Sequence, residues 1–266
     1  MPGDFERPER KIPSHDWEHF QLYENVGRCL AGIPEYFRST ISVMGVGVTE
    51  IYSFSTVLGL TIEQEVIRTL NDLRSEWDPT GNYRDFHFIR QAQTFPDVLF
   101  ANPATGQIIM GIELKSWYLL AKEGEPSFRY QVTVEACAVQ DLLVVIPWVL
   151  SNVLSGNPIV LKPYIETARY VAEYRNYWWR SIRKSKSSEE IISPLDVTPY
   201  PSAKTQISDM PVSDSGNNFG RIARIGLLDE YVQSFQDYNL LGVRTADWRR
   251  FLKEQVERNA DYFSDE

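Results

Sequence analysis

Hydrophobic residues recur every three or four positions between residues 61 and 77, a spacing that predicts an amphipathic helix. Thr61 is a suitable first residue because it forms a capping box with Gln64. The predicted apolar face consists of Val66, Ile67, Leu70, Leu73 and Trp77. This regular stretch opens the best-patterned part of the chain.

The pattern then changes to short extended stretches. Residues 86–89 are aromatic, residues 98–100 are apolar, and residues 108–114 alternate along the chain, all of which is typical of adjacent strands. The sequence at residues 102–106, Asn-Pro-Ala-Thr-Gly, predicts a turn between the last two strands. A helix over residues 126–140 and a fully buried strand over residues 142–146 complete the prediction. The expected order is helix, three strands, helix, strand.

Two charged residues interrupt the last of the three strands. Because side chains alternate between the faces of a strand, Ile109, Gly111, Glu113 and Lys115 share one face. A turn centred near Ala104 sets Asp97 opposite Gly111 and diagonally next to Glu113. Two carboxylates and an amine then converge beside a glycine that leaves room for an ion.

This grouping suits the hydrolysis of a phosphodiester. Carboxylates hold Mg²⁺, which withdraws charge from the phosphate and lowers the pKa of a bound water. The Lys115 ammonium can hold the attacking water or stabilise the negative charge that develops in the transition state.

The segment Pro96-Asp97, fifteen intervening residues, and then Glu113-Leu114-Lys115, in the predicted αβββαβ order, resembles the PD-(D/E)xK nuclease superfamily and its type II restriction endonucleases. The resemblance covers about residues 59–148. It implies an α/β fold with a restriction-endonuclease-like αβββαβ core, in which helices flank a mixed central sheet. It also implies that Asp97 and Glu113 bind Mg²⁺, for which Mn²⁺ substitutes, and that Lys115 assists the nucleophilic water.

The expected activity is metal-dependent, site-specific cleavage of double-stranded DNA. Two alternatives stay open, namely a repair or resolvase-type nuclease of the same superfamily and a non-catalytic nuclease-like module that binds DNA. Cutting both strands of a palindromic site is simplest with two active sites related by a twofold axis, so we expect a homodimer.

Glu63 has two interpretations. It shares a helical face with apolar residues such as Val66 and Leu70, where an unpaired carboxylate is costly. It either faces water near the start of the helix, as we expect for Glu65, or reaches the metal site as a further catalytic and metal-binding acid.

Candidate DNA-binding residues lie outside the motif. A stretch over residues 169–186 interleaves basic and aromatic residues, which either bind nucleic acid or form a helix whose aromatic side packs in the core. Polar residues after residue 216 also suit the reading of base edges. The candidates are Arg175, Arg180, Arg183, Lys184, Asn218 and Arg221.

The composition restricts the class of protein. A net charge of -9 disfavours a protein that coats nucleic acid over its whole surface, although it allows a local basic surface. The only two cysteines, Cys29 and Cys137, and the lack of an apolar N-terminal run predict a cytoplasmic protein. The most apolar stretch, residues 142–154, is too short to span a bilayer, so we expect no membrane association.

The chain divides into three predicted parts. Residues 1–45 are expected to pack on the core, residues 46–184 to form the nuclease core, and residues 185–266 to form an irregular and helical segment for DNA recognition or dimerisation. Prolines are frequent between residues 184 and 216, which indicates a long irregular stretch. Thr245 is expected to cap a helix that ends near Asn259.

Overall fold

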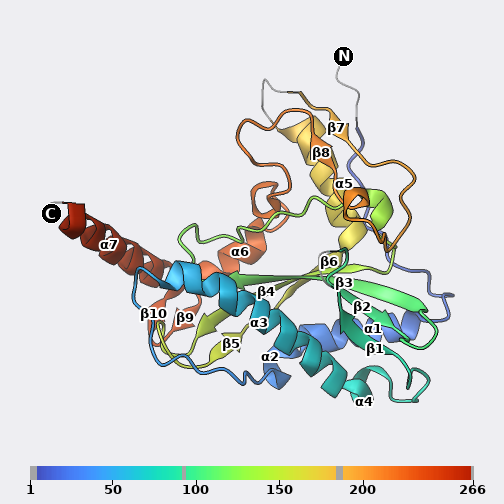
Figure 1. Ribbon diagram of the computed structural model, residues 1–266, viewed down its shortest axis with the longest axis horizontal. Helices are drawn as coiled ribbons and strands as arrows, with labels where there is room; N and C mark the ends of the chain where they lie inside the picture. Colours follow the sequence, from blue (N-terminus) through green and yellow to red (C-terminus); the bar gives the residue numbers. More distant parts are fainter. Residues whose placement is uncertain (1–4, 92–93, 184–187, 265–266) are drawn as a thin grey trace.

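The computed structural model describes residues 5–91, 94–183 and 188–264, apart from the side chains of residue 206 and residues 259–264. A mixed sheet lies at its centre (Figure 1). The first three strands are antiparallel, β3 and β4 are parallel, and β5 and β6 both run antiparallel to β4. The strands are β1 (His87–Arg90), β2 (Val98–Ala101), β3 (Ile108–Tyr118), β4 (Leu142–Leu150), β5 (Pro158–Val160) and β6 (Tyr164–Thr167).

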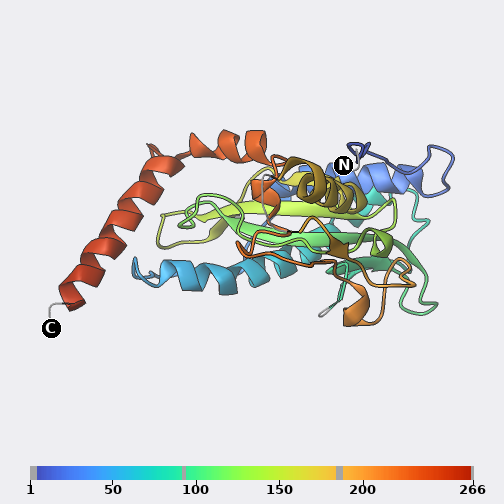
Figure 2. The same ribbon diagram turned by 90° about the horizontal axis from the view of Figure 1, so that it is seen from above.

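Helices cover both faces of the sheet (Figure 2). On one face lies α3 (Ile51–Asp72), and on the other lie α1 (Phe20–Ala31), α5 (Ala168–Tyr177) and α6 (Asp229–Gln236). The C-terminal helix α7 (Thr245–Ser264) projects away from the body. The short helices are α2 (Ile33–Tyr36) and α4 (Arg74–Trp77).

The remaining elements are small. A π-helical turn, Trp178–Ile182, extends α5, and 3-10 turns occur at Val134–Ala136, Lys204–Gln206 and Ile222–Arg224. Two strand pairs complete the described chain, β7 (Ile191–Ile192) with β8 (Met210–Pro211) and β9 (Asn239–Leu240) with β10 (Val243–Arg244). A mixed central sheet flanked by helices is therefore confirmed. The narrower restriction-endonuclease-like core stays a prediction, because in the described chain only the 3-10 turn Val134–Ala136, and no α-helix, lies between β3 and β4.

The strands were the most predictable elements. β2 and β3 are joined by the expected turn, in which the side-chain oxygen of Asn102 accepts the N–H of Ala104 at 2.9 Å. Gly106 adopts a positive φ of 74°, which glycine tolerates without strain. β3 continues past residue 114 to Tyr118 because Trp117 and Tyr118 are buried and pair with β4.

The helix predicted from Thr61 onward corresponds to α3, which begins earlier than predicted. α3 starts at Ile51, and its buried side includes Ile51, Leu58 and Ile62. Thr61 is therefore inside the helix, where its hydroxyl donates to the carbonyl of Val57 at 3.3 Å. A threonine can occupy a helix interior in this way, and the capping box was a misleading signal.

The helix predicted over residues 126–140 is wrong. This segment is extended, apart from the turn Val134–Ala136, and its backbone pairs with the C-terminal part of the chain. The N–H of Tyr130 donates to the carbonyl of Gly220 at 2.7 Å, and the N–H of Thr133 donates to the carbonyl of Ile207 at 2.7 Å. The partners lie far away in sequence, so local periodicity could not reveal them.

The last helix corresponds to α7, but Thr245 does not cap it. Its hydroxyl donates to the carbonyls of Phe235 and Gln236 and so ties the start of α7 to the end of α6. Leu252 is buried, and Trp248 and Val256 are partly buried beside it. Among the described residues, no helix combines the length and the apolar character needed to cross a membrane.

Candidate active site

The C-terminal half of β3 runs past the end of β2. β2 pairs with β3 only as far as Ile112, so residues 114–118 of β3, which we call its free edge, have no neighbouring strand on that side within the described chain. Carboxylates accept the N–H groups there instead. Asp97 Oδ2 accepts the N–H of Leu114 at 3.1 Å, and Glu63 Oε1 accepts the N–H of Ser116 at 3.0 Å. Backbone N–H groups require such acceptors, so the free edge brings together acids from two distant segments.

The register between β2 and β3 differs from the prediction. Leu99, not Asp97, lies opposite Gly111, and the pairing of Val98 with Ile112 places Asp97 opposite Glu113. A bulge near Phe100 and a turn centred after Ala104 each shift the register by one position. The two acids are therefore closer than expected, and the N–H of Asp97 donates to Glu113 Oε2 at 3.2 Å.

Lys115 joins the two carboxylates. Its Nζ lies 2.7 Å from Glu113 Oε1 and 3.0 Å from Asp97 Oδ2. The side chain of Glu113 is 9% exposed, and those of Lys115 and Asp97 are 21% and 32% exposed. The predicted convergence is confirmed, since the structure brings the three side chains together.

Burial and charge act in opposite directions within this triad. Burial raises the pKa of Glu113, whereas the neighbouring Lys115 ammonium lowers it. Burial would lower the pKa of Lys115, but Glu113 and Asp97 outweigh it and raise that pKa above the ordinary value. Lys115 is therefore a permanent cation, suited to holding an anion or a water rather than to giving up its proton.

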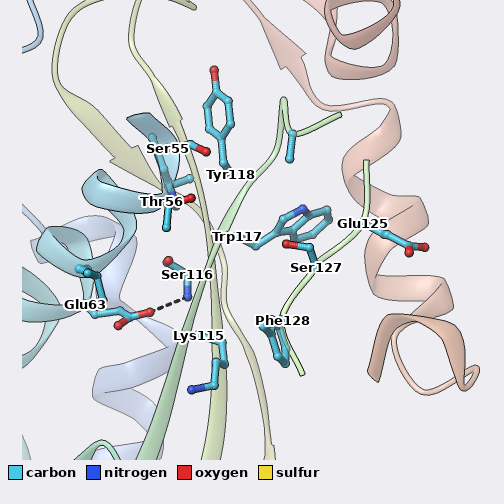
Figure 3. Close-up of a pocket in the computed structure, with 13 residues that line it drawn as sticks. Ser55, Thr56, Glu63, Lys115, Ser116, Trp117, Tyr118, Glu125, Ser127 and Phe128 are labelled. Atoms are coloured by element: carbon cyan, nitrogen blue, oxygen red, sulfur yellow. Dashed lines mark hydrogen bonds between the residues drawn. The ribbon is translucent and has the colours of Figure 1, made fainter. Parts of the chain in front are cut away.

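Glu63 reaches the same place from α3 (Figure 3). A Cβ on Gly59 would lie 2.3 Å from Ser116 Oγ, so the glycine allows α3 to approach β3 closely. Glu63 follows one turn later, and burial raises the pKa of its carboxyl while Lys115 partly offsets the effect. The interpretation that Glu63 simply faces water is wrong.

The expectation that Glu65 faces water is wrong as well. Glu65 is 4% exposed, and its Oε1 accepts the N–H and the hydroxyl of Thr40, each at 2.7 Å. The longer course of α3 explains both results, because helix rotation is fixed by the buried residues before Thr61. Glu65 anchors the segment ahead of α3 and is not a suitable control for Glu63.

Gly111 has a different role from the one predicted. A Cβ there would lie 2.2 Å from Cγ of Pro96, so the glycine makes room for a proline rather than for an ion. Its N–H donates to Asp141 Oδ1 at 2.7 Å, and Asp141 also accepts the N–H of Ala138 and the hydroxyl of Tyr200. The close approach of Pro96 to Gly111 fixes the position of Asp97, the next residue along the chain.

A cavity of about 280 Å³ opens beside Lys115. Figure 3 shows Glu63 on one side of it and Trp117 and Phe128 on the other. Its hydroxyl groups come from both walls, and its floor is the free edge of β3. The polar lining residues include Ser55, Thr56, Glu63, Lys115, Ser116, Glu125 and Ser127. An extended polar ligand can therefore reach the acids from this side.

The oxygen donors suit the metal that the resemblance implies. Asp97 Oδ1 and Glu63 Oε2 make no hydrogen bond to the described residues, and carboxylate oxygens are the ligands that Mg²⁺ prefers. Within the same part of the chain, however, no group of three or more His, Cys, Asp or Glu side chains is already arranged to hold a metal ion. The Lys115 ammonium lies between Asp97 and Glu113, so a cation bound there must share their oxygens with it.

The predicted DNA-binding residues of α5 have different environments. Arg175 is 1% exposed and ion-pairs with Asp209, so the prediction that it contacts DNA is wrong. Tyr170, Tyr174 and Trp179 are buried, as expected for the aromatic side of a packed helix. The long side chain of Arg175 crosses the core because the carbonyls of the extended segment 130–132 need donors.

The other candidates are more accessible. Arg180 lies over the ring of Phe5 at 5.2 Å, and Arg183 lies over the ring of Trp179 at 3.4 Å. Asn218 is half-buried and accepts a hydrogen bond from Arg224 at 3.0 Å. Arg221 is half-buried beside the segment at residues 127–132, and Lys184 lies outside the described residues. Their proposed role in binding DNA stays a prediction.

Arg129 and Lys204, which the sequence pattern did not single out, line a second cavity next to Glu113. The prediction of a helix over residues 126–140 obscured Arg129, because it separated that residue from its partners near residue 220.

A scan against protein-family models and a search of curated proteins each find no match to this chain. The resemblance described above therefore rests on the motif alone.

Proposed function

We propose that this protein is a Mg²⁺-dependent endonuclease that hydrolyses phosphodiester bonds of double-stranded DNA at specific sites. The observation that carries the proposal is the convergence of Asp97, Glu113 and Lys115, with Glu63, at the free edge of β3. Buried acids held beside a lysine at the mouth of a cavity are suited to phosphate chemistry.

Each side chain has a distinct task in the proposed reaction. Asp97, Glu113 and Glu63 would hold Mg²⁺, which when bound supplies a more acidic water and withdraws charge from the phosphate. Lys115, held by Asp97 and Glu113, orients the attacking water and stabilises the negative charge that develops on the phosphate oxygens. Glu113 is 9% exposed, so bulk water has little access to its carboxylate, which strengthens these interactions.

Incubation of the purified protein with plasmid and phage DNA, in Mg²⁺ or in EDTA, tests the proposal. We expect discrete fragments in Mg²⁺ and in Mn²⁺, none in EDTA, and loss of cleavage in Lys115→Met and Asp97→Asn. The control is Lys122→Met, which replaces an exposed lysine outside the motif and outside the lining of both cavities. Absence of metal-dependent cleavage on linear, supercoiled and branched DNA would contradict an enzyme.

The substrate decides between the proposed restriction activity and the alternatives. Cleavage only at junctions or flaps would indicate a repair or resolvase-type nuclease, and DNA binding without cleavage would indicate a non-catalytic module. If both strands of a palindromic site are cut, we expect a homodimer on DNA. Light scattering of the complex measures this, and a monomeric complex that makes double-strand breaks would contradict the dimer.

A further inference from the structure

A second cavity, of about 200 Å³, is lined by Glu113 but not by Glu63. Its lining combines hydroxyl and amide groups with two cations. The residues are Thr94, Phe95, Glu113, Arg129, Gln131, Val132, Lys204, Ile207 and Ser208. Glu113 is the only acidic residue among them, and it is already paired with Lys115 at 2.7 Å. The remaining charge of the lining is therefore positive.

A third cation stands beside Arg129. Arg221 lies directly opposite Arg129 in an antiparallel bridge, so the two side chains leave the backbone on the same face. Like charges in that position destabilise each other unless an anion lies nearby. Arg221 Nε is also buried without a hydrogen-bond partner in the described structure, which is costly for a guanidinium. Arg129 Nη2 donates to the carbonyl of Asn217 at 2.9 Å, but a carbonyl does not neutralise the guanidinium charge. The two arginines therefore keep positive charge that an anionic ligand can neutralise.

The two cavities are lined by neighbouring residues of the candidate active site. Lys115 lines the first cavity and Glu113 lines the second. The extended segment at residues 127–132 borders both, since Ser127 and Phe128 line the first and Arg129 and Gln131 line the second. A chain-like ligand that follows this segment would pass over the Glu113–Lys115 pair.

We infer that Arg129, Lys204 and Arg221 form an anion pocket for a backbone phosphate of the substrate strand, next to the phosphate that is cut. The inference rests on the proposed function, because it takes the ligand to be a nucleic acid. The aromatic and hydroxyl-lined first cavity then faces the nucleotide on the other side of the cut. A chain with a net charge of -9 thus concentrates cations where the polyanion must approach its acids.

The salt dependence of DNA binding tests the anion pocket. Fluorescence anisotropy with a labelled duplex of mixed sequence, in EDTA, measures binding without requiring cleavage. The plot of log K against log salt has a negative slope, and each lost phosphate contact reduces the magnitude of that slope by about 0.9. We therefore expect a fall of about 0.9 for Lys204→Gln, and of about 2–3 for Arg129→Gln/Lys204→Gln/Arg221→Gln. Lys204 is exposed, so its replacement leaves the fold intact.

The matched control is Lys11→Gln/Lys162→Gln, which replaces two exposed lysines outside both cavities and outside the segment expected to recognise DNA. An unchanged slope in Lys204→Gln and in the triple variant would overturn the anion pocket. An equal fall in the control would overturn it too, because the effect would then reflect overall charge. If these slopes change as expected but Mg²⁺ supports no cleavage, the anion pocket stands and the nuclease proposal fails.

Discussion

Replacement of Lys115 by methionine removes a charge while keeping most of the side-chain volume. In the native protein the ammonium lies 2.7 Å from Glu113 Oε1 and 3.0 Å from Asp97 Oδ2. Without it, two neighbouring carboxylates repel each other and one of them is almost fully buried. Breaking a buried ion pair by removing one partner costs about 3–5 kcal/mol. Asp97 is one-third exposed and contributes less, so we expect a loss of about 2–4 kcal/mol in EDTA.

Thermal unfolding followed by circular dichroism measures this loss. A change of 1 kcal/mol shifts the Tm of a protein of this size by about 2–4 °C, so the variant should melt about 5–15 °C below the wild type in EDTA. Mg²⁺ should restore much of the difference, because it replaces the missing positive charge. Binding at a hundred times the Kd contributes about 2.7 kcal/mol.

Two further variants separate the charge effect from a general loss of stability. Lys122→Met should melt like the wild type, since Lys122 is exposed. Lys115→Met/Glu113→Gln should be more stable in EDTA than Lys115→Met, because the buried charge is gone, and should gain less from Mg²⁺. A Lys115→Met variant as stable as the wild type in EDTA would refute the ion-paired triad. A Tm that Mg²⁺ leaves unchanged in the wild type and in Lys115→Met would refute the metal site.

Three other predictions follow from individual side chains. Glu63→Gln should lower the rate of plasmid cleavage at least tenfold and raise the Mg²⁺ requirement. Asp72→Asn, which replaces an exposed acid on the same helix, should do neither, and equal rates for the two variants would contradict the role of Glu63. Burial raises the pKa of Asp141 to about 6 from 3.8, so the folded state binds the proton more tightly and loses stability as pH rises from about 4 through 6. Urea unfolding should show the wild type losing about 2–3 kcal/mol relative to Asp141→Asn across that range, and parallel pH curves would exclude the shift. Arg175→Met should destabilise the protein by about 3–5 kcal/mol, since Asp209 is left buried and unpaired, with no change in the salt dependence of DNA binding; a changed slope would return Arg175 to the DNA interface.

Local pattern predicted the centre of the site well. The turn after Asn102 and the alternation along β3 are both short-range features, and together they bring Asp97, Glu113 and Lys115 to one end of the sheet. The register error did not spoil the prediction, because a shift of two positions keeps a side chain on the same face. Helix periodicity likewise placed Glu63 on the inner side of α3, although it could not locate the start of the helix.

Long-range pairing could not be predicted in the same way. The segment around Tyr130 has apolar residues at helical spacing, yet its backbone is satisfied by carbonyls and N–H groups near residues 207 and 220. Arg175 became a core residue for the same reason, since it donates to the carbonyls of Tyr130 and Val132. The anion pocket depends on these contacts and was therefore invisible in the sequence.

The acids at the free edge of β3 also limit self-association. An unpaired strand edge next to the very apolar β4 is a template on which another chain can add a strand. Asp97 and Glu63 already occupy the N–H groups of Leu114 and Ser116, and their charge repels a second backbone. Residues proposed for chemistry thus act as gatekeepers against aggregation. Asparagine and glutamine keep an acceptor at these positions, so they separate chemistry from solubility better than alanine does.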